Sequence, residues 1–460
     1  MLLVLLALAL RLFRLDLQGM RGDESYSVLL ALRPLSAITS ELIAKDPHPP
    51  VYYYALHYWM QIAGEREFVV RFPSVLFDVL AVPLVYSLGR SLFSRTVGLT
   101  AAGILAVSPF HLWNAQEVRM YTVAATLGLA ATVMFVRALG LGIGPAGPRW
   151  RLLVPYTVLS VLGLYVHYYV VFILLSHNLA VLVRLGRNLP ALGRWLLAQV
   201  GVIVLYLPWL VVALSVIEGY SGTGESPGFV ALVERSLVAF GAGLTMETGL
   251  RPWLAVGFGL VLLAGVWRGA ARWGITVLVP VLYLAVPVLA IFLASRERPI
   301  FSERYLLPAA PAYFILVGCV ASAAFERTLP RVRDYALRGF ALFALVAIAA
   351  TSSVSTYNLH FNEAFAKGSD WRSAAAYVAS GFQDGDVIVL NYPDPGFPYS
   401  LRPYNRDKDL IVLPSSGPMD EYKTGGEIDD LLRTHRRFWL TPTRAGNWDH
   451  NGFVEGRLDR

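Results

Sequence analysis

Apolar residues form long unbroken runs along most of this chain, and charged residues gather between the runs. Residues 96–116 and residues 275–294 contain no Asp, Glu, Lys or Arg. As a helix, each of these runs is long enough to cross a bilayer core of roughly 30 Å. The apolar pattern predicts about eleven membrane-spanning helices, near residues 2–13, 70–92, 96–115, 120–138, 150–166, 168–184, 194–213, 252–267, 274–294, 305–325 and 337–355.

One apolar stretch can be divided in two ways. Residues 152–183 are uncharged throughout, and as a single helix they would be about 48 Å long, which is too long for one crossing. They form either two short spans that turn at His167-Tyr168-Tyr169 or one long tilted helix. The distribution of arginine favours two spans, because only then do the basic loops share one side of the membrane.

In the two-span arrangement, every other loop is rich in arginine. These loops hold Arg90 and Arg95; Arg137, Arg149 and Arg151; Arg184, Arg187 and Arg194; Arg268 and Arg272; and Arg327, Arg331, Arg333 and Arg338. Short basic loops stay in the cytoplasm, so we expect the N-terminus on the cytoplasmic side. The outer side then carries the loops 14–69, 116–119, 214–251 and 295–304 and the tail after Tyr357.

The composition also indicates a multi-pass protein of the cell membrane. Apolar residues are 56% of the chain, charged residues are 15%, and the mean hydropathy is +0.53, whereas soluble domains carry about 25% charged residues. The net charge of +7 does not indicate nucleic-acid binding, because the arginines lie at the ends of apolar runs rather than on one polar face. The single cysteine, Cys319, allows no disulfide within the chain. Residues 1–17 lack the basic start and the cleavage site of a signal peptide, so we interpret them as a first span that is not removed.

The segment after residue 357 has a different pattern. It contains predicted helices at 370–380 and 427–434 and predicted strands at 386–390 and 437–440. Alternating helices and strands predict a small α/β domain. We therefore expect a transmembrane domain at 1–357, which includes the external loop 14–69, and a soluble extracytoplasmic domain at 358–460.

Two groups of chemically active residues lie in the first outer loop. Asp23 and Glu24 follow the first span. Asp23 or Ser25 could cap a helix there, and an acid at this place could also take a proton from an acceptor hydroxyl; the two roles are compatible. His48 precedes two prolines and an aromatic helix that begins near Val51 and is expected to lie in the membrane interface. His48 is either a capping group or a contact to a phosphate.

Two further groups lie in later outer loops. Glu117 and Arg119 belong to a loop so short that its charges lie at the membrane surface, at the depth of a lipid phosphate. The alternative for Arg119 is an ordinary interfacial charge that reaches out from a helix start. Arg304 belongs to a cluster of outer arginines that runs against the positive-inside tendency and so predicts an anionic partner. A phosphate suits the planar guanidinium group, and the alternative partner is Glu297 or Glu303.

Taken in chain order, these groups resemble the GT-C membrane glycosyltransferases, specifically the bacterial family 39 enzymes. Those enzymes are similar to protein O-mannosyltransferases and to the aminoarabinose transferase of lipid A. The resemblance rests on motifs that extend from the first to the tenth span. They are Asp23-Glu24; His48-Pro49-Pro50; Arg71-Phe72-Pro73-Ser74; Ser108-Pro109-Phe110 through Gln116-Glu117-Val118-Arg119-Met120-Tyr121; His167-Tyr168-Tyr169; and Arg304-Tyr305-Leu306-Leu307-Pro308. The aminoarabinose transferase has a lysine where this chain has His48, so the resemblance does not extend to a shared donor or acceptor.

The resemblance implies a GT-C fold and a sugar donor linked to polyprenyl or dolichyl phosphate, with a lipid, glycan or protein as acceptor. It implies that Asp23 is the general base, that Glu24 lies nearby, and that Glu117 is a second catalytic acid. The substrate-binding residues that it implies are His48, Arg71, Arg119, Tyr121, His167, Arg304 and Tyr305. A divalent cation stays open as a cofactor, because two carboxylates are few ligands for a metal ion.

The sequence thus predicts a polytopic all-α membrane enzyme with a small C-terminal α/β domain. It would transfer a sugar to a hydroxyl group on the outer face of the membrane by an inverting single displacement. The alternative is a transporter or flippase of a lipid-linked substrate. Transporters place ionisable residues near the middle of the bilayer, often at broken helices, whereas only Asp78 is clearly inside a span here.

Overall fold

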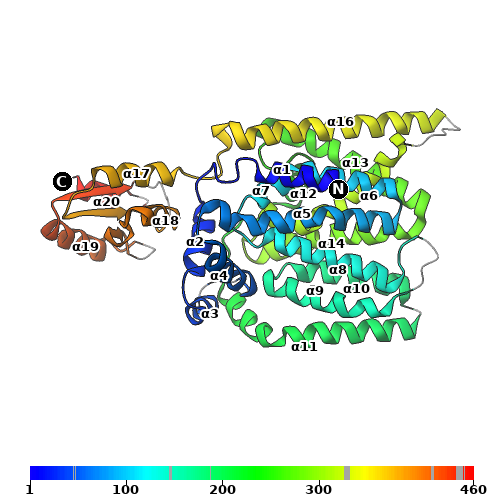
Figure 1. The fold of residues 1–460 in the computed structure, drawn as a ribbon, viewed down its shortest axis with the longest axis horizontal. Coiled ribbons are helices and arrows are strands. Elements are labelled where there is room, and N and C mark those ends of the chain that lie inside the picture. Colours follow the sequence, from blue (N-terminus) through cyan, green and yellow to red (C-terminus); the bar gives the residue numbers. More distant parts are fainter. Residues whose placement is uncertain are drawn as a thin grey trace. The chain divides into compact units, whose positions relative to one another are not determined.

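A computed structural model describes residues 1–460 except 45, 47, 144–147, 187, 326–331, 416–418, 442–448, 450 and 460. Among the arginines of the basic loops, Arg187, Arg327 and Arg331 lie outside the described residues, as does the side chain of Arg333. The chain divides into two compact units (Figure 1). Unit 1 comprises residues 1–15 and 31–365, and unit 2 comprises residues 16–30 and 366–460. The domain limits expected from composition stay predictions.

Unit 1 is a bundle of helices, and each of the eleven expected spans contains one. Its α-helices are α1 (Leu2–Leu12), α3 (Leu35–Ala44), α4 (Val51–Ala63), α5 (Glu67–Leu92), α6 (Arg95–Val107), α7 (Pro109–Ala115), α8 (Tyr121–Leu139), α9 (Leu153–Val166), α10 (Val170–Leu185), α11 (Leu189–Gly219), α12 (Phe229–Ala242), α13 (Arg251–Trp273), α14 (Leu278–Glu297), α15 (Ala310–Ala321) and α16 (Val332–Phe361). Short 3-10 helices, η4 (Glu303–Ala309) and η5 (Ser322–Phe325), flank α15. The helical membrane fold is therefore confirmed.

The described helices that are long enough to cross a membrane are fewer than the eleven expected spans. In the described part of the chain, six helices are long and apolar enough to cross a membrane, or seven if α6 and α7 form one bent span. The expected eleven included α1, α9 and α10, which are shorter apolar helices. The expected spans also divided the 50-residue run Thr248–Glu297 in two, and the two parts correspond to α13 and α14. The short 3-10 helix η3 (Gly274–Val277) separates them and begins at Gly274, which has a positive φ of 57°. That run would be about 75 Å long as one helix, more than twice the thickness of the bilayer core.

A buried ion pair stabilises the bend between α6 and α7. The two helices meet at 54° beside Pro109, which has no backbone N–H to give to the preceding turn. Arg11 of α1 donates to the carbonyl oxygens of Leu105 and Ala106 at 3.0 and 2.6 Å, so it satisfies the end of α6. Its Nε also donates to the Asp78 carboxylate of α5 at 2.6 Å.

The second oxygen of Asp78 lies 2.6 Å from Nδ1 of His111 in α7. The expectation that Asp78 is the ionisable residue inside a span was therefore incomplete, because Arg11 and His111 share its site. Arg11 lies near the end of the first expected span, residues 2–13. All three side chains are buried.

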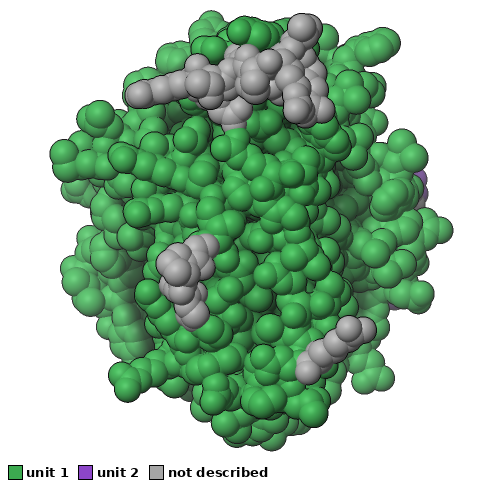
Figure 2. All heavy atoms as spheres, turned by 90° about the vertical axis from the view of Figure 1, so that its right-hand side faces the viewer, with its two compact units in different colours: residues 1–15, 31–365 green, residues 16–30, 366–460 purple. Residues whose placement is uncertain are grey.

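Helices α5 and α8 run side by side in the same direction and define the two ends of unit 1. The Thr126 hydroxyl of α8 donates to the Phe77 carbonyl of α5 at 2.7 Å, and near their last turns Arg137 donates to the Ser87 hydroxyl at 2.5 Å. We call the end where both helices begin the polar end; it holds residues 46, 48–50, 116–121, 167–169 and 302–305. We call the opposite end the basic end; it holds Arg90, Arg95, Arg137, Arg149, Arg151, Arg184, Arg194, Arg268 and Arg272. The basic end is at the right of Figure 1 and faces the viewer in Figure 2.

Unit 2 combines α2 (Gly22–Ala31), of which residues 22–30 belong to this unit, with a small α/β domain. The domain contains α17 (Trp371–Gly381), β1 (Asp386–Leu390), α18 (Gly396–Leu401), β2 (Leu410–Val412), α19 (Glu421–Thr434), β3 (Arg437–Thr441) and α20 (Phe453–Leu458). Its described strands form a parallel sheet in the order β2-β1-β3. The expected C-terminal α/β domain is thus confirmed.

The sheet is covered on both faces because the side chains of β1 alternate. Ile388 and Leu390 pack with α17 and α18, and Val387 and Val389 pack with α19 and α20. Asp370 caps α17 by accepting a hydrogen bond from the Ser373 amide at 3.0 Å.

Candidate active site

The acidic pair lies in the first turn of α2, in unit 2. The Glu24 carboxylate accepts a hydrogen bond from the Arg21 amide at 3.2 Å, which is the contact that the acid of a capping box makes at a helix start. Glu24 is buried, whereas Asp23 is exposed. Carboxylates at a helix N-terminus are favoured by the helix dipole. The Asp23 carboxylate is therefore at the surface of unit 2, held by a helix whose start is fixed by its neighbour.

At the polar end of unit 1, three side chains form a hydrogen-bonded chain. Nδ1 of His48 lies 2.5 Å from the Asp46 carboxylate, and the His48 amide donates to the same oxygen at 2.8 Å. Nε2 of His48 lies 3.4 Å from the Arg119 guanidinium. Burial alone would raise the pKa of Asp46, but His48 and Arg119 outweigh it and hold that pKa below its ordinary value. Asp46 is thus an anion that orients His48 toward Arg119.

His167 offers one hydrogen-bond donor to the same region. It lies between α9 and α10, and its Nδ1 accepts a hydrogen bond from the Tyr169 amide at 3.2 Å. The neutral ring must therefore carry its proton on Nε2. Burial, together with the nearby His48 and Arg119, holds the pKa of His167 well below its ordinary value. His167 is only 7% exposed, and its buried Nε2 has no hydrogen-bond partner among the described residues.

Aromatic rings complete the wall around these groups. The Tyr121 ring lies 5.5 Å from the His167 ring and 5.7 Å from the Tyr305 ring. The guanidinium carbons of Arg119 and Arg304 both lie 5.7 Å from the centre of the Tyr121 ring. Two arginines from distant parts of the chain therefore lie close to one aromatic ring, which makes this region attractive for an anion.

Two other expected site residues, Glu117 and Arg71, lie near the end of α1. Glu117 is only 1% exposed in the turn between α7 and α8. The preceding Gln116 fixes this turn to the end of α1, because its side chain donates to the carbonyls of Arg11 and Phe13 at 3.0 and 2.9 Å. Arg71 of α5 donates to the Leu15 carbonyl at 2.9 Å, so its guanidinium helps to hold the end of α1.

Arg298 and Glu303, which stand close to Arg304 in the sequence, each bond to other parts of unit 1. Arg298 donates to backbone carbonyls at the end of α11, including that of Tyr220 at 3.0 Å, and so caps that helix. Glu303, the alternative partner of Arg304, lies 2.6 Å from Nε of Arg235 in α12. Arg235 also pairs with Glu225 at 2.5 Å. Sequence reasoning missed Arg235, because a single arginine inside a helical segment carries no local signal of its partners.

An apolar cavity adjoins the polar end. It has a volume of about 360 Å³ and lies among α4, α5, α8 and α9. Its lining includes Val51, Tyr52, Val123 and Val166, which stand within a few positions of His48, Tyr121 and His167 in the sequence. Some residues that line the cavity are therefore close in sequence to the residues that could hold an anion. The apolar wall of the cavity suits a hydrocarbon chain.

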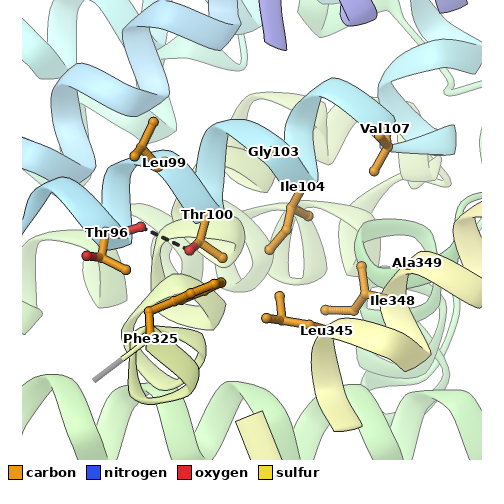
Figure 3. Close-up of a pocket in the computed structure, with 10 residues that line it drawn as sticks. All are labelled: Thr96, Leu99, Thr100, Gly103, Ile104, Val107, Phe325, Leu345, Ile348 and Ala349. Atoms are coloured by element: carbon orange, nitrogen blue, oxygen red, sulfur yellow. Dashed lines mark hydrogen bonds between the residues drawn. The ribbon is translucent and has the colours of Figure 1, made fainter. Parts of the chain in front are cut away.

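A larger cavity lies away from the candidate site residues. It measures about 500 Å³ and is bounded by α6, η5 and α16, with Leu99, Ile104, Phe325, Leu345 and Ile348 in its wall (Figure 3). The Thr100 hydroxyl donates to the Thr96 carbonyl at 2.9 Å within α6, as Figure 3 shows. The lining contains no ionisable side chain, so this cavity has no group for acid–base chemistry. In the described residues, no group of three or more His, Cys, Asp or Glu side chains is arranged to hold a metal ion.

Comparisons with known proteins identify the fold of the chain. Residues 47–212 match the model of the dolichyl-phosphate-mannose-protein mannosyltransferase family. ArnT from Cupriavidus metallidurans is similar in structure, with a TM-score of 0.61 and 14% identity over 95% of this chain and 88% of that chain. The same protein bound to undecaprenyl phosphate gives a TM-score of 0.60 and 14% identity over 95% and 89% of the two chains.

The oligosaccharyltransferase AglB from Archaeoglobus fulgidus, in complex with an inhibitory peptide and a dolichol-phosphate, has a TM-score of 0.55 and 13% identity. That comparison covers 93% of this chain and 68% of AglB. No curated protein matches the sequence. At these identities the common feature is the fold, and it extends over nearly the whole chain. The chain has the GT-C fold of membrane glycosyltransferases.

Proposed function

We propose that this protein transfers a sugar from a polyprenyl-phosphate-linked donor to a hydroxyl acceptor at the membrane surface. The observation that carries the proposal is the convergence of Arg119 and Arg304 on Tyr121, beside the His167 donor and an apolar cavity. A lipid phosphate has the two parts that such a region suits, an anionic head and a hydrocarbon tail. The GT-C fold and the ArnT structure with undecaprenyl phosphate support the same ligand class.

In the proposed reaction, the phosphate of the donor is the leaving group. Arg119 and Arg304 balance its charge, and Nε2–H of His167 donates to one of its oxygens. His48 and Asp46 keep the Arg119 guanidinium in place. Holding the leaving oxygen by preformed cations lowers the free energy of the transition state, because charge grows on that oxygen as the bond to the sugar breaks.

The acidic pair would activate the acceptor. Asp23 takes the proton of the acceptor hydroxyl, the hydroxyl oxygen forms a bond to the anomeric carbon, and the bond between that carbon and the phosphate oxygen breaks. This single displacement inverts the anomeric centre and needs no covalent intermediate on the enzyme. Glu24 supports the helix that carries Asp23, and Glu117 is proposed as a second acid near the acceptor. The acceptor class is a lipid, a glycan or a protein.

The proposed orientation follows from the basic loops. With the basic end in the cytoplasm, the polar end faces the extracytoplasmic side, together with the C-terminal domain. The cell membrane is thus the proposed site of action, and a polyprenyl-phosphate sugar exposed on its outer face is the proposed donor.

A transporter of a lipid-linked substrate is the alternative. The broken span α6–α7 and the buried Arg11, Asp78 and His111 are features that transporters also have. Here, however, Arg11 donates to the Asp78 carboxylate and to backbone carbonyls of α6, and the second oxygen of Asp78 bonds to His111. Because these charges are enclosed and used to hold three helices together, they favour a structural role over a substrate pathway.

The decisive experiment combines purified protein with a panel of polyprenyl-phosphate sugars and a membrane extract as acceptor. We expect release of free polyprenyl phosphate, detected by mass spectrometry, with at least one donor. Asp23→Asn should reduce this release by about 10²- to 10⁴-fold while leaving thermal stability unchanged, because Asn cannot take the proton. Movement of donor across vesicles by wild-type protein without any release would support the transporter instead.

A further inference from the structure

We propose that the C-terminal α/β domain positions the acidic pair, through Arg372 and Asp394, and is therefore part of the catalytic apparatus. This proposal rests on the proposed function of Asp23. The segment 16–30, which carries Asp23 and Glu24, belongs to the same compact unit as residues 366–460. A domain that served only as a soluble extension would have no reason to hold this segment.

The first set of contacts holds the backbone that leads into α2. The Arg372 guanidinium of α17 donates to the carbonyl of Asp16 at 3.0 Å and to that of Leu17 at 3.5 Å. The Lys367 amide donates to the side chain of Gln18 at 2.8 Å. One arginine therefore bridges two successive peptide groups a few residues before Asp23, a geometry that the forked guanidinium group allows.

The second contact is at the first residue of α2. A Cβ atom built on Gly22 would lie only 2.9 Å from a carboxylate oxygen of Asp394. That carboxylate is itself fixed, because it accepts hydrogen bonds from the Gly396 amide at 2.7 Å and from the Trp371 indole at 3.3 Å. The negative charge of Asp394 thus lies at the N-terminus of α2, where the helix dipole favours it.

The part of the domain that makes these contacts is rigidly supported. Asp394 follows the central strand β1, at the carboxyl edge of the parallel sheet, and Trp371 begins α17. Both elements belong to a hydrophobic core in which Phe397, Ile388 and Leu390 are fully buried. Asp394 and Trp371 therefore link the packed sheet to the first turn of α2, which carries Asp23. In doubly wound sheets this edge is the usual place for functional loops.

The expected consequence is kinetic. Misplacement of a catalytic group by about 1 Å can cost 10²-fold in rate, whereas binding of the lipid phosphate does not depend on this segment. Arg372→Ala should lower kcat at least tenfold and leave KM for the lipid donor unchanged. Arg372→Lys should recover part of the loss, because one ammonium group can bond only some of the carbonyls that the guanidinium reaches.

Arg433→Ala is the matched control. Arg433 is an exposed arginine of the same domain that pairs with Asp430 at 3.5 Å, far in sequence from the contacts described above. This variant should behave as wild type. Gly22→Ala provides an independent test at the second contact, because its methyl group would push against Asp394; we expect a fall in kcat without a fall in donor affinity.

The outcomes separate the two proposals. If Asp23→Asn is inactive and Arg372→Ala and Gly22→Ala keep full kcat, the domain does not position the acidic pair and this inference is wrong, while the proposed function stands. If Asp23→Asn keeps full activity, the base assignment itself fails. A loss in Arg372→Ala that is matched by lower thermal stability and by weaker donor binding would indicate a general folding role and would also overturn the inference.

Discussion

Both ends of unit 1 contain arginines, but the two ends differ in how far the arginines are buried and in what they contact. At the polar end, Arg119 is only 5% exposed and contacts His48 and the Tyr121 ring. At the basic end, Arg137 and Arg149 are exposed, and the flanking loops 85–98, 136–153, 183–196 and 266–278 contain no Asp or Glu. The number of arginines therefore does not locate an anion site. Burial among ordered aromatic and imidazole groups distinguishes a candidate site from charge that only orients the protein in the membrane.

The largest effect should come from the arginine that is most enclosed. Arg119→Ala removes a cation that is held in position by His48 and would act on the leaving phosphate. Losses of 10²- to 10³-fold in kcat are typical when one preorganised group of this kind is removed. We expect a loss of this size in steady-state sugar transfer. A near-normal kcat in a folded Arg119→Ala variant would contradict the role of the polar end.

Arg304 should give a smaller effect that separates charge from shape. Charge-assisted hydrogen bonds contribute about 1.5–3 kcal/mol each, so Arg304→Ala should weaken donor use by about ten- to a hundredfold. Arg304→Lys should rescue only part of this loss, since lysine keeps the charge and loses the planar fork. Titration of the lipid donor against both variants measures this. Unchanged KM and kcat in Arg304→Ala would exclude a phosphate contact, and lower stability alone would indicate a structural role.

His167 should show a modest loss of transfer and a characteristic dependence on pH. His167→Phe keeps a ring and removes one neutral donor, so we expect about a tenfold lower kcat/KM. Because the pKa of His167 is lowered in the folded protein, the unfolded chain binds the proton more readily. Folding stability should therefore fall as pH drops below about 6.5, the ordinary value. Thermal unfolding at pH 7 and pH 5 should show a smaller decrease in His167→Phe than in wild type; equal decreases would contradict the assignment.

The smallest effect should come from the basic end. Arg149→Gln removes one exposed charge that has no acidic neighbour in its own loop. We expect kcat and donor KM within about twofold of wild type, because exposed charges contribute little to local energetics. A loss comparable to that of Arg119→Ala would remove the distinction between the two ends.

The sequence predicted the long apolar helices of unit 1, because they depend on local patterns. Long apolar runs require helices in a membrane, since every backbone group must be satisfied within its own segment. The strands β1 and β3 were predicted from short, largely apolar segments at 386–390 and 437–440. The strand β2 was missed, because Leu410–Val412 is only three residues long and owes its pairing to the neighbouring strand β1.

Contacts between distant side chains were beyond the reach of local patterns. His48 lies 71 positions from Arg119, and Arg11 lies 67 positions from Asp78. Neither pair follows from spacing on one helix, so the sequence identified His48 and Arg119 as separate candidates but not as partners. Asp46 stands two positions before His48 and is not among the candidates from the sequence, because only the structure brings its carboxylate to Nδ1 of that ring.

Binding of undecaprenyl phosphate without a sugar measures the proposed anion site separately from sugar transfer. Titrations should compare wild-type protein with Arg119→Ala at the polar end and Arg149→Gln at the basic end, with a polyprenol that lacks the phosphate as a second ligand. We predict that Arg119→Ala raises the Kd for the phosphate lipid at least tenfold, that Arg149→Gln leaves it unchanged, and that the polyprenol binds equally to all three proteins. Equal Kd values for the phosphate lipid in wild type and Arg119→Ala, or a greater loss in Arg149→Gln, would contradict the account.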